Sequence, residues 1–175
     1  MTYIGVPLVV GGVIVRSEDD HFRSLRNDYM PRFDRHADDY MQYAPAAIML
    51  GMKVAGVQSR SSWGRMIVSD AFSAILMGSV VNTLKRTTNV ERPDGSNRHS
   101  FPSGHTATAF MTATMFNKEY GHKSPWIGVG AYSMATVTGL MRMANNKHWL
   151  SDVLTGAGFD VVVMRSTYST GPSPS

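Results

Sequence analysis

Apolar residues along this chain gather in stretches of helical length, separated by short polar connections. Five stretches rich in Ala, Gly, Ser, Thr and Met follow one another, at residues 44–57, 65–84, 103–117, 126–141 and 149–164. The strict alternation of polar and apolar positions that marks strands is missing. Small residues let helices approach one another closely. The pattern therefore predicts an all-α fold, a single bundle of about six helices.

The first 43 residues predict helices of a different kind. Residues 1–15 are apolar but lack a basic start and a clear cleavage site, which favours an anchoring or packed helix over a cleaved signal peptide. Residues 17–43 interleave acids and arginines with aromatic side chains, which is typical of one or two amphipathic helices broken at Pro31. Such a helix either packs on the bundle or lies in a membrane interface.

Composition favours a membrane-embedded or membrane-associated bundle. Charged residues make up 17% of the 175 residues, against about 25% in soluble domains. The mean hydropathy of −0.15 is modest for a protein embedded in lipid. A charged residue interrupts three of the apolar stretches, at Lys53, Asp70 and Asp160. Helices that span the membrane are therefore plausible but short of the usual run of about 20 uncharged residues. We expect one domain over residues 1–168 and a disordered tail over residues 169–175.

Charge and cysteine content narrow the chemistry. The formal net charge of +4 favours anionic partners such as lipid headgroups, phosphates or nucleic acid. The chain has no cysteine, which excludes disulfides, thiolate nucleophiles and cysteine-ligated metal centres.

Two polar motifs flank the connection before the third apolar stretch. Lys85 and Arg92 lie seven residues apart, near a predicted helix end. The sequence PSGH, residues 102–105, opens the next stretch, with Ser103 as a candidate N-cap and Gly104 allowing close approach to the backbone. The free N–H groups of a helix start attract anions. These residues therefore predict an anion site.

A third motif lies around the last predicted connection, where Arg142 ends one apolar stretch and His148 and Asp152 begin the next. The spacing of four places the histidine and the aspartate on one helix face. A carboxylate bonded to one ring nitrogen leaves the other nitrogen free to attack. If the five stretches run up and down, this connection and residues 85–102 lie at the same end of the bundle.

In order and spacing, K-x6-R-P, P-S-G-H and R-x5-H-x3-D resemble the motifs of the type 2 phosphatidate phosphatase superfamily, which includes class A acid phosphatases and vanadium haloperoxidases. The motifs occupy residues 85–152. The resemblance implies an all-helical bundle and metal-independent phosphate transfer through a phosphohistidine, with no cofactor. Two departures stand out: Met141 precedes the arginine of the third motif, where the family usually has Ser, and the likeness fades after Gly158.

The resemblance also implies a role for each motif residue. His148 would be the nucleophile, oriented by Asp152, and His105 would be the general acid that protonates the leaving alcohol. The phosphate oxygens would be bound by Lys85, Arg92, Ser103, Gly104 and Arg142. We expect no metal site, because the chain shows no carboxylate cluster typical of magnesium, and we interpret Asp38 and Asp39 as surface groups.

These observations predict a phosphatase that acts on a lipid phosphate monoester or diphosphate, with the membrane and a phosphorylated lipid as partners and no nucleic acid. The alternatives are a soluble acid phosphatase of broad specificity, a vanadate-dependent haloperoxidase, and a catalytically silent phospholipid-binding or structural membrane protein. Basic residues at the end opposite the motifs predict a site that faces the periplasmic or extracytoplasmic side: Arg60, Arg65, Lys118 and Lys123.

Overall fold

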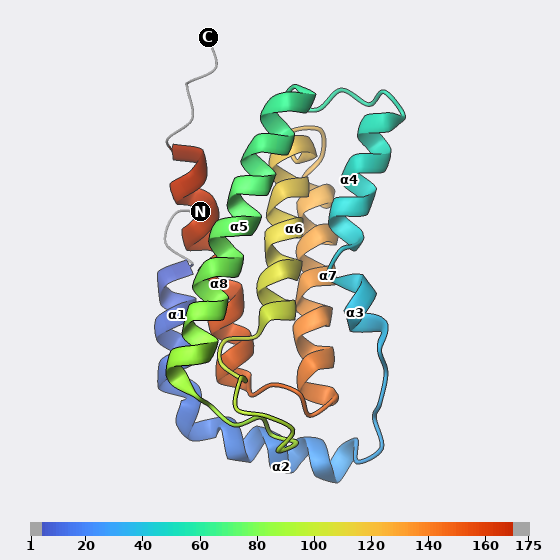
Figure 1. Cartoon of the computed structure of the whole chain (residues 1–175). Helices are drawn as coiled ribbons and strands as arrows, with labels where there is room; N and C mark the ends of the chain where they lie inside the picture. The colour runs from blue at the N-terminus through green and yellow to red at the C-terminus, as the bar shows by residue number, and fades with distance from the viewer. Residues whose placement is uncertain (1–4, 170–175) are drawn as a thin grey trace.

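The computed structural model describes residues 5–169 (Figure 1). This part of the chain is helical and contains no strand, so the all-α prediction is confirmed. Of the predicted tail, residues 170–175 lie outside the described residues. The elements are α1 (Gly5–Ile14), a 3₁₀ helix η1 (Val15–Glu18), α2 (Asp19–Tyr29), α3 (Ala37–Met41), α4 (Ala44–Val54), α5 (Trp63–Thr88), α6 (Gly104–Tyr120), α7 (Pro125–Ala144) and α8 (Leu150–Ser169).

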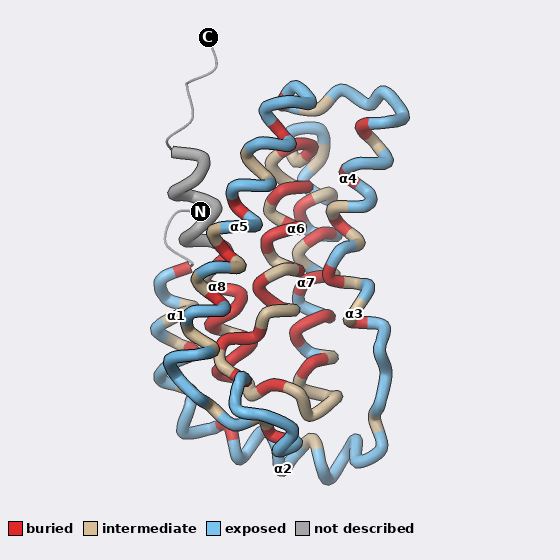
Figure 2. The backbone as a smooth tube through the Cα atoms, in the orientation of Figure 1, coloured by how far each residue is buried: buried red, intermediate tan, exposed pale blue. Residues whose placement is uncertain are grey.

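Helix α6 forms the centre of the bundle, with α4, α5, α7 and α8 packed around it (Figures 1 and 2). The buried side chains of α6 are small or flexible, among them Ala109, Ala113 and Met115. Alanine leaves the neighbouring backbones close together, and methionine fills the irregular gaps. All five predicted apolar stretches are therefore helices of one core.

Helices α4 to α8 run up and down, which brings two connections to the same end of the bundle (Figure 1). These are residues 89–103, between α5 and α6, and residues 145–149, between α7 and α8. We call this the site end, because all three sequence motifs lie there. The predicted arrangement of the motif connections is confirmed.

Two glycines allow α8 to lie unusually close to its neighbours. A Cβ atom at Gly156 would lie 2.7 Å from the carbonyl oxygen of Ser103, at the start of α6. A Cβ atom at Gly12 of α1 would lie 2.3 Å from Thr155 Oγ1 of α8. Because real Cβ atoms do not approach so closely, glycine at position 12 lets α1 lie against α8, and glycine at position 156 lets α8 lie against the start of α6. This contact places the second and third motifs next to each other.

Helix α2 crosses the site end roughly perpendicular to the bundle (Figure 1). Asp19, at its start, accepts hydrogen bonds from the backbone N–H of Ser151 (3.0 Å) and from the hydroxyl of the same residue (2.5 Å). Near its end, Arg26 Nε donates to the carbonyl oxygen of Ala144, 2.8 Å away. The helix ends at Tyr29, and Pro31 lies in the following turn, as predicted. It therefore packs on the bundle and is held at both ends.

One helix within residues 5–169, α5, is long and apolar enough to cross a membrane. It has 26 residues, and only 17% of its most apolar stretch is buried in the bundle. Its exposed side chains are large and apolar, including Val68, Phe72 and Ile75. Such a face is costly in water, so its composition fits a lipid environment.

The hydrogen bonds of Asp19 yield a testable expectation about stability. Asp19→Ala removes the acceptor of an N–H group in the first turn of α8, and losing such a cap costs about 0.5–2 kcal/mol. We expect the free energy of unfolding to fall by that amount in chemical denaturation of the detergent-solubilised protein. Asp20→Ala, at the exposed neighbouring position, is the matched control and should have no effect. Equal losses in both variants would contradict the capping role.

Candidate active site

His148 and Asp152 form a buried pair at the start of α8. His148 lies in the connection just before the helix, and only 3% of it is exposed. Its Nδ1 atom lies 3.4 Å from Oδ2 of Asp152, which is in the first turn of α8 and is fully buried. The predicted pairing is thus present, although His148 itself precedes the helix. Nε2 is the ring nitrogen that this contact leaves available.

The Asp152 carboxylate also accepts hydrogen bonds from the two connections at the site end. Its Oδ2 atom accepts the Ser100 hydroxyl in a short hydrogen bond, and it also accepts the backbone N–H of Trp149 at 2.9 Å. The backbone of Asp152 accepts the N–H of Ser103 at 3.0 Å. These bonds join the PSGH turn to the start of α8. Sequence reasoning missed Ser100, because a serine two residues before Pro102 carries no signal of its own.

The PSGH turn starts α6 as predicted. Ser103 is the N-cap, and its hydroxyl accepts from the N–H of Thr106 (3.4 Å) and from the Thr106 hydroxyl (2.9 Å). The preceding Phe101–Pro102 peptide bond is cis. A Cβ atom at Gly104 would lie 3.7 Å from Lys85 Cε, so the stem of the lysine passes beside this turn. The first motif thus meets the second at the start of α6.

The three predicted cations lie near one another and near His148. Lys85 is in the last turn of α5, and its ammonium donates to the carbonyl oxygen of His99 at 2.8 Å. Burial lowers the pKa of Arg92, and the neighbouring charge of Arg142 lowers it further. Both arginines have a buried Nε with no hydrogen-bond partner in the described residues. Unpaired donors in a cluster of like charges are suited to an anion.

The pKa of His148 is lowered to about 4. Burial is the main cause, the pairing with Asp152 opposes it, and the charges of Lys85 and Arg92 add to it. The ring is therefore neutral near pH 7. A neutral imidazole has the lone pair that a nucleophile needs.

The interpretation of Asp38 as a surface group was wrong, whereas the side chain of Asp39 is 44% exposed but is paired with residues of the site. Asp38 is fully buried, and its Oδ2 atom accepts from Arg142 NH1 at 2.7 Å. Asp39 Oδ1 lies 2.9 Å from His105 Nε2 and 3.4 Å from Arg142 NH1. The two acids begin the short helix α3, which packs against α6 and α7. Their partners are more than 60 residues away in the chain, so the local sequence around the two acids does not predict these contacts.

His105 occupies the second position of α6, partly buried beside Arg142. Burial is the main cause that lowers its pKa below the ordinary value, and the charge of Arg142 acts in the same direction. The hydrogen bond and charge of Asp39 oppose both. The carboxylate engages Nε2 and leaves Nδ1 for another partner.

Ion pairs and hydrogen bonds also join the two connections at the site end. Lys147 donates to Asp94 Oδ2 at 2.7 Å, and the indole N–H of Trp149 donates to the carbonyl oxygen of Glu91 at 2.7 Å. Burial acts to raise the pKa of Asp94, but hydrogen bonds from Lys147 and Ser96 outweigh it and lower the value to about 2. The segment that carries Arg92 is thereby held against the one that carries His148.

Comparisons with known proteins place this site in the context of related sequences and folds. A lipid A 1-phosphatase of Porphyromonas gingivalis is 45% identical over 159 residues, which are 90% of this chain; the chain spans 36% of that relative's length. Two solved structures share the fold. A transmembrane PAP2 type phosphatidylglycerolphosphate phosphatase from Bacillus subtilis has a TM-score of 0.65 at 16% identity, covering 95% of each chain. Aquifex aeolicus LpxE has a TM-score of 0.63 at 18% identity, covering 83% of this chain and 93% of the other.

The family model that matches, described as the PAP2 superfamily, covers residues 63–171. This range holds all eight motif residues and the whole of α8, so the expected fading of the likeness after Gly158 was wrong. The physical reason is that α8 continues as one helix to Ser169 despite Asp160, whose buried carboxylate accepts from the Thr114 hydroxyl at 2.6 Å. The chain belongs to the PAP2 superfamily.

Proposed function

We propose that this chain is a phosphatase that hydrolyses a lipid phosphate monoester or diphosphate through a phosphohistidine on His148. The observation that carries the proposal is the neutral, buried His148 ring, held by Asp152 and surrounded by three cations. Two of the similar proteins are named for acting on phosphorylated lipids, the lipid A 1-phosphatase and the phosphatidylglycerolphosphate phosphatase. Their names support a lipid as the leaving group.

In the first step, Nε2 of His148 attacks phosphorus and the bond from phosphorus to the ester oxygen breaks. The departing alkoxide takes a proton from His105. Asp152 stabilises the positive charge that develops on the His148 ring. In the second step, a water molecule attacks the phosphohistidine while His105, now neutral, takes its proton. Phosphate leaves and both histidines return to their starting states.

Cations and helix N–H groups do the electrostatic work in this mechanism. The transferred phosphoryl group spreads its charge over three equatorial oxygens, and fixed positive groups lower the barrier. Lys85, Arg92 and Arg142 provide those groups, with Ser103 and the N–H of Gly104 at the start of α6. The pairing of Arg142 NH1 with Asp38 orients the guanidinium and leaves its Nε for a phosphate oxygen. We propose that no metal ion takes part.

Asp39 acts on the general acid. Its carboxylate favours the protonated form of His105 and fixes the ring through Nε2, so that Nδ1 carries the transferable proton. Burial and the positive charge of Arg142 have the opposite effect, because both lower the pKa of His105 and so disfavour its protonated form. The acid therefore depends on a carboxylate from α3.

We also propose that the bundle lies in a membrane with its site end on the extracytoplasmic side. The exposed apolar face of α5 supports the membrane location. Exposed basic residues at the opposite end, including Arg60, Arg65 and Lys123, favour the cytoplasmic side for that end.

The purified protein should release phosphate from at least one member of a panel of lipid phosphates, with EDTA present. Acid-labile, alkali-stable phosphate should appear on His148 in quenched enzyme, read by mass spectrometry, because Nε2 is not the nitrogen paired with Asp152 and the ring lies near Lys85 and Arg92. His148→Ala should abolish turnover, while His122→Ala, at an exposed position far from the site, should not. An adduct on another residue, or activity that needs added magnesium or zinc, would contradict the mechanism.

The loss caused by His105→Ala should depend on the leaving group. A lipid alkoxide needs a proton as it departs, whereas p-nitrophenolate leaves without one. General acid catalysis contributes roughly 10²–10⁴-fold, so kcat/KM should fall by about that factor on a lipid phosphate and by much less on p-nitrophenyl phosphate. Equal losses on both substrates would remove the acid role, provided that circular dichroism shows a folded variant.

The pH profile of kcat/KM should be bell-shaped with an acidic optimum. His148 must be neutral, so activity rises through its pKa of about 4. His105 must be protonated, so activity falls as the pH rises through its pKa, which burial places below the ordinary value of about 6.5. Asp39→Asn removes a charge that raises the pKa of His105, so the alkaline limb should move to lower pH. Asp20→Asn is the control, and an unmoved limb in Asp39→Asn would rule out the coupling.

A further inference from the structure

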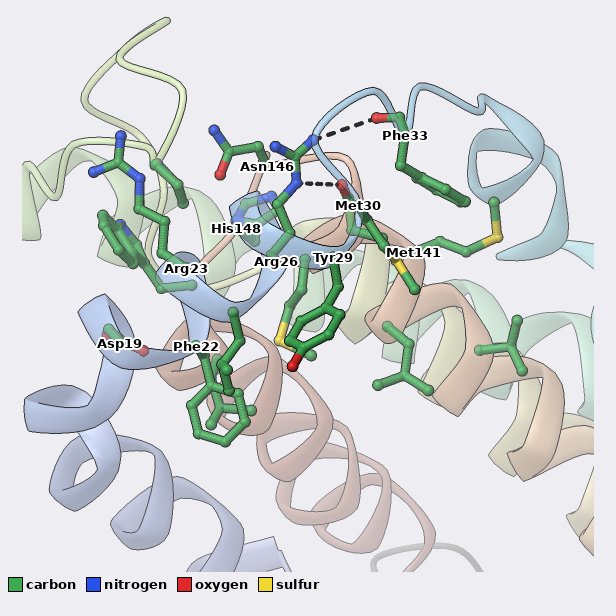
Figure 3. A pocket seen from close by; sticks show the side chains of 18 residues that line it. Asp19, Phe22, Arg23, Arg26, Tyr29, Met30, Phe33, Met141, Asn146 and His148 are labelled. Atoms are coloured by element: carbon green, nitrogen blue, oxygen red, sulfur yellow. Dashed lines mark hydrogen bonds between the residues drawn. The ribbon is translucent and has the colours of Figure 1, made fainter.

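An apolar groove opens between α2 and α7 and reaches the start of α8 (Figure 3). We call it the α2–α7 groove, and its cavity volume is about 470 Å³. Phe22 and Leu25 of α2 line one wall, Val137 and Leu140 of α7 line the other, and His148 lines the inner end. The groove therefore joins the proposed nucleophile to the outer surface.

The groove exists because α2 is held at its ends by polar bonds. Asp19 fixes its first turn to α8 and Arg26 fixes its last turn to the end of α7. Between these two points, the apolar side chains of α2 face the bundle without closing on it. Phe22 is 44% exposed, and Leu140 on the opposite wall is 53% exposed. A surface of this kind gains free energy when an apolar ligand covers it.

The lining favours a hydrocarbon chain over a peptide. Arg26 of α2 lines the groove, but it already donates to the carbonyl oxygens of Ala144 and Phe33 (Figure 3). Few polar groups are left to pair with a peptide backbone. A lipid chain needs no hydrogen bonds, so it leaves none unmade.

The inner end of the groove is suited to an anionic headgroup. His148 lies there, and Arg23 and Arg26 of α2 line the same cavity (Figure 3). The guanidinium of Arg23 lies over the ring of Trp149, 5.6 Å from its centroid. A ligand that is apolar at one end and anionic at the other matches this order of groups.

We propose that the α2–α7 groove binds a hydrocarbon chain of the lipid phosphate substrate and so sets the phosphate against His148. The inference rests on the proposed function. The groove would then select for substrates by the presence of a long chain, while the cation cluster binds the phosphate of any substrate.

Alkyl phosphates test this subsite as competitive inhibitors of p-nitrophenyl phosphate hydrolysis, with the protein in lipid nanodiscs. In the wild type, dodecyl phosphate should inhibit more strongly than butyl phosphate. Leu140→Trp fills the groove and should weaken inhibition by dodecyl phosphate roughly tenfold, the effect of losing about two buried methylene contacts. Inhibition by butyl phosphate, whose short chain covers little of the groove, should stay unchanged.

Val129→Trp is the matched control, because Val129 lies on α7, is also 53% exposed and does not line the groove. Partition of the long chain into the nanodisc affects all three proteins equally, so only a difference between the two variants reports on the groove. Equal inhibition constants in Leu140→Trp and the wild type would overturn the proposal.

A second readout does not depend on catalysis. A dodecyl phosphate with a diazirine at the far end of its chain should label residues of α2 or α7 on irradiation, and Leu140→Trp, but not Val129→Trp, should reduce that labelling. Labelling confined to the exposed face of α5, or crosslinking of two copies of the chain through the groove, would overturn the proposal. Groove labelling without p-nitrophenyl phosphate hydrolysis would support the subsite and refute the phosphatase function.

Discussion

The candidate site depends on a single buried carboxylate, that of Asp152 at the start of α8. It binds the His148 ring, the Ser100 hydroxyl and the N–H of Trp149. These donors come from both connections at the site end, so one side chain holds together segments about 50 residues apart. Burial raises the cost of leaving any of these groups unpaired, which makes the arrangement specific. The proposed nucleophile, His148, is therefore oriented by the same carboxylate that joins the two connections at this end.

The cations around His148 repel one another, and the fold offsets this with acids outside the three motifs. Arg142 is paired with buried Asp38, and Asp39 lies between Arg142 and His105. Asp94 pairs with Lys147 beside the segment that carries Arg92. Asp38 and Asp39 each contact Arg142, and Asp94 joins the two connections at the site end. The charge cluster can thus persist before an anionic substrate arrives.

Helix α2 links the site to the apolar surface. Its polar bonds to α7 and α8 fix its position, and its apolar side chains face the bundle from a distance that leaves a groove. The same helix that caps the start of α8 through Asp19 also forms a wall beside His148. One amphipathic segment, which the sequence alone left between two interpretations, therefore supports the start of α8 and also lines the groove proposed to bind a lipid chain.

The sequence by itself determined the helices and the motif residues, because apolar stretches of helical length and the spacing from Lys85 to Asp152 are local or ordered along the chain. It also determined the Ser103 cap, the break at Pro31 and the common end of the two motif connections. Only the tertiary structure decided the roles of Asp38, Asp39 and Ser100, since their partners are distant in the chain and aspartates in a polar stretch look like surface groups. The groove was likewise decided in three dimensions, because its walls come from α2 and α7, more than 100 residues apart.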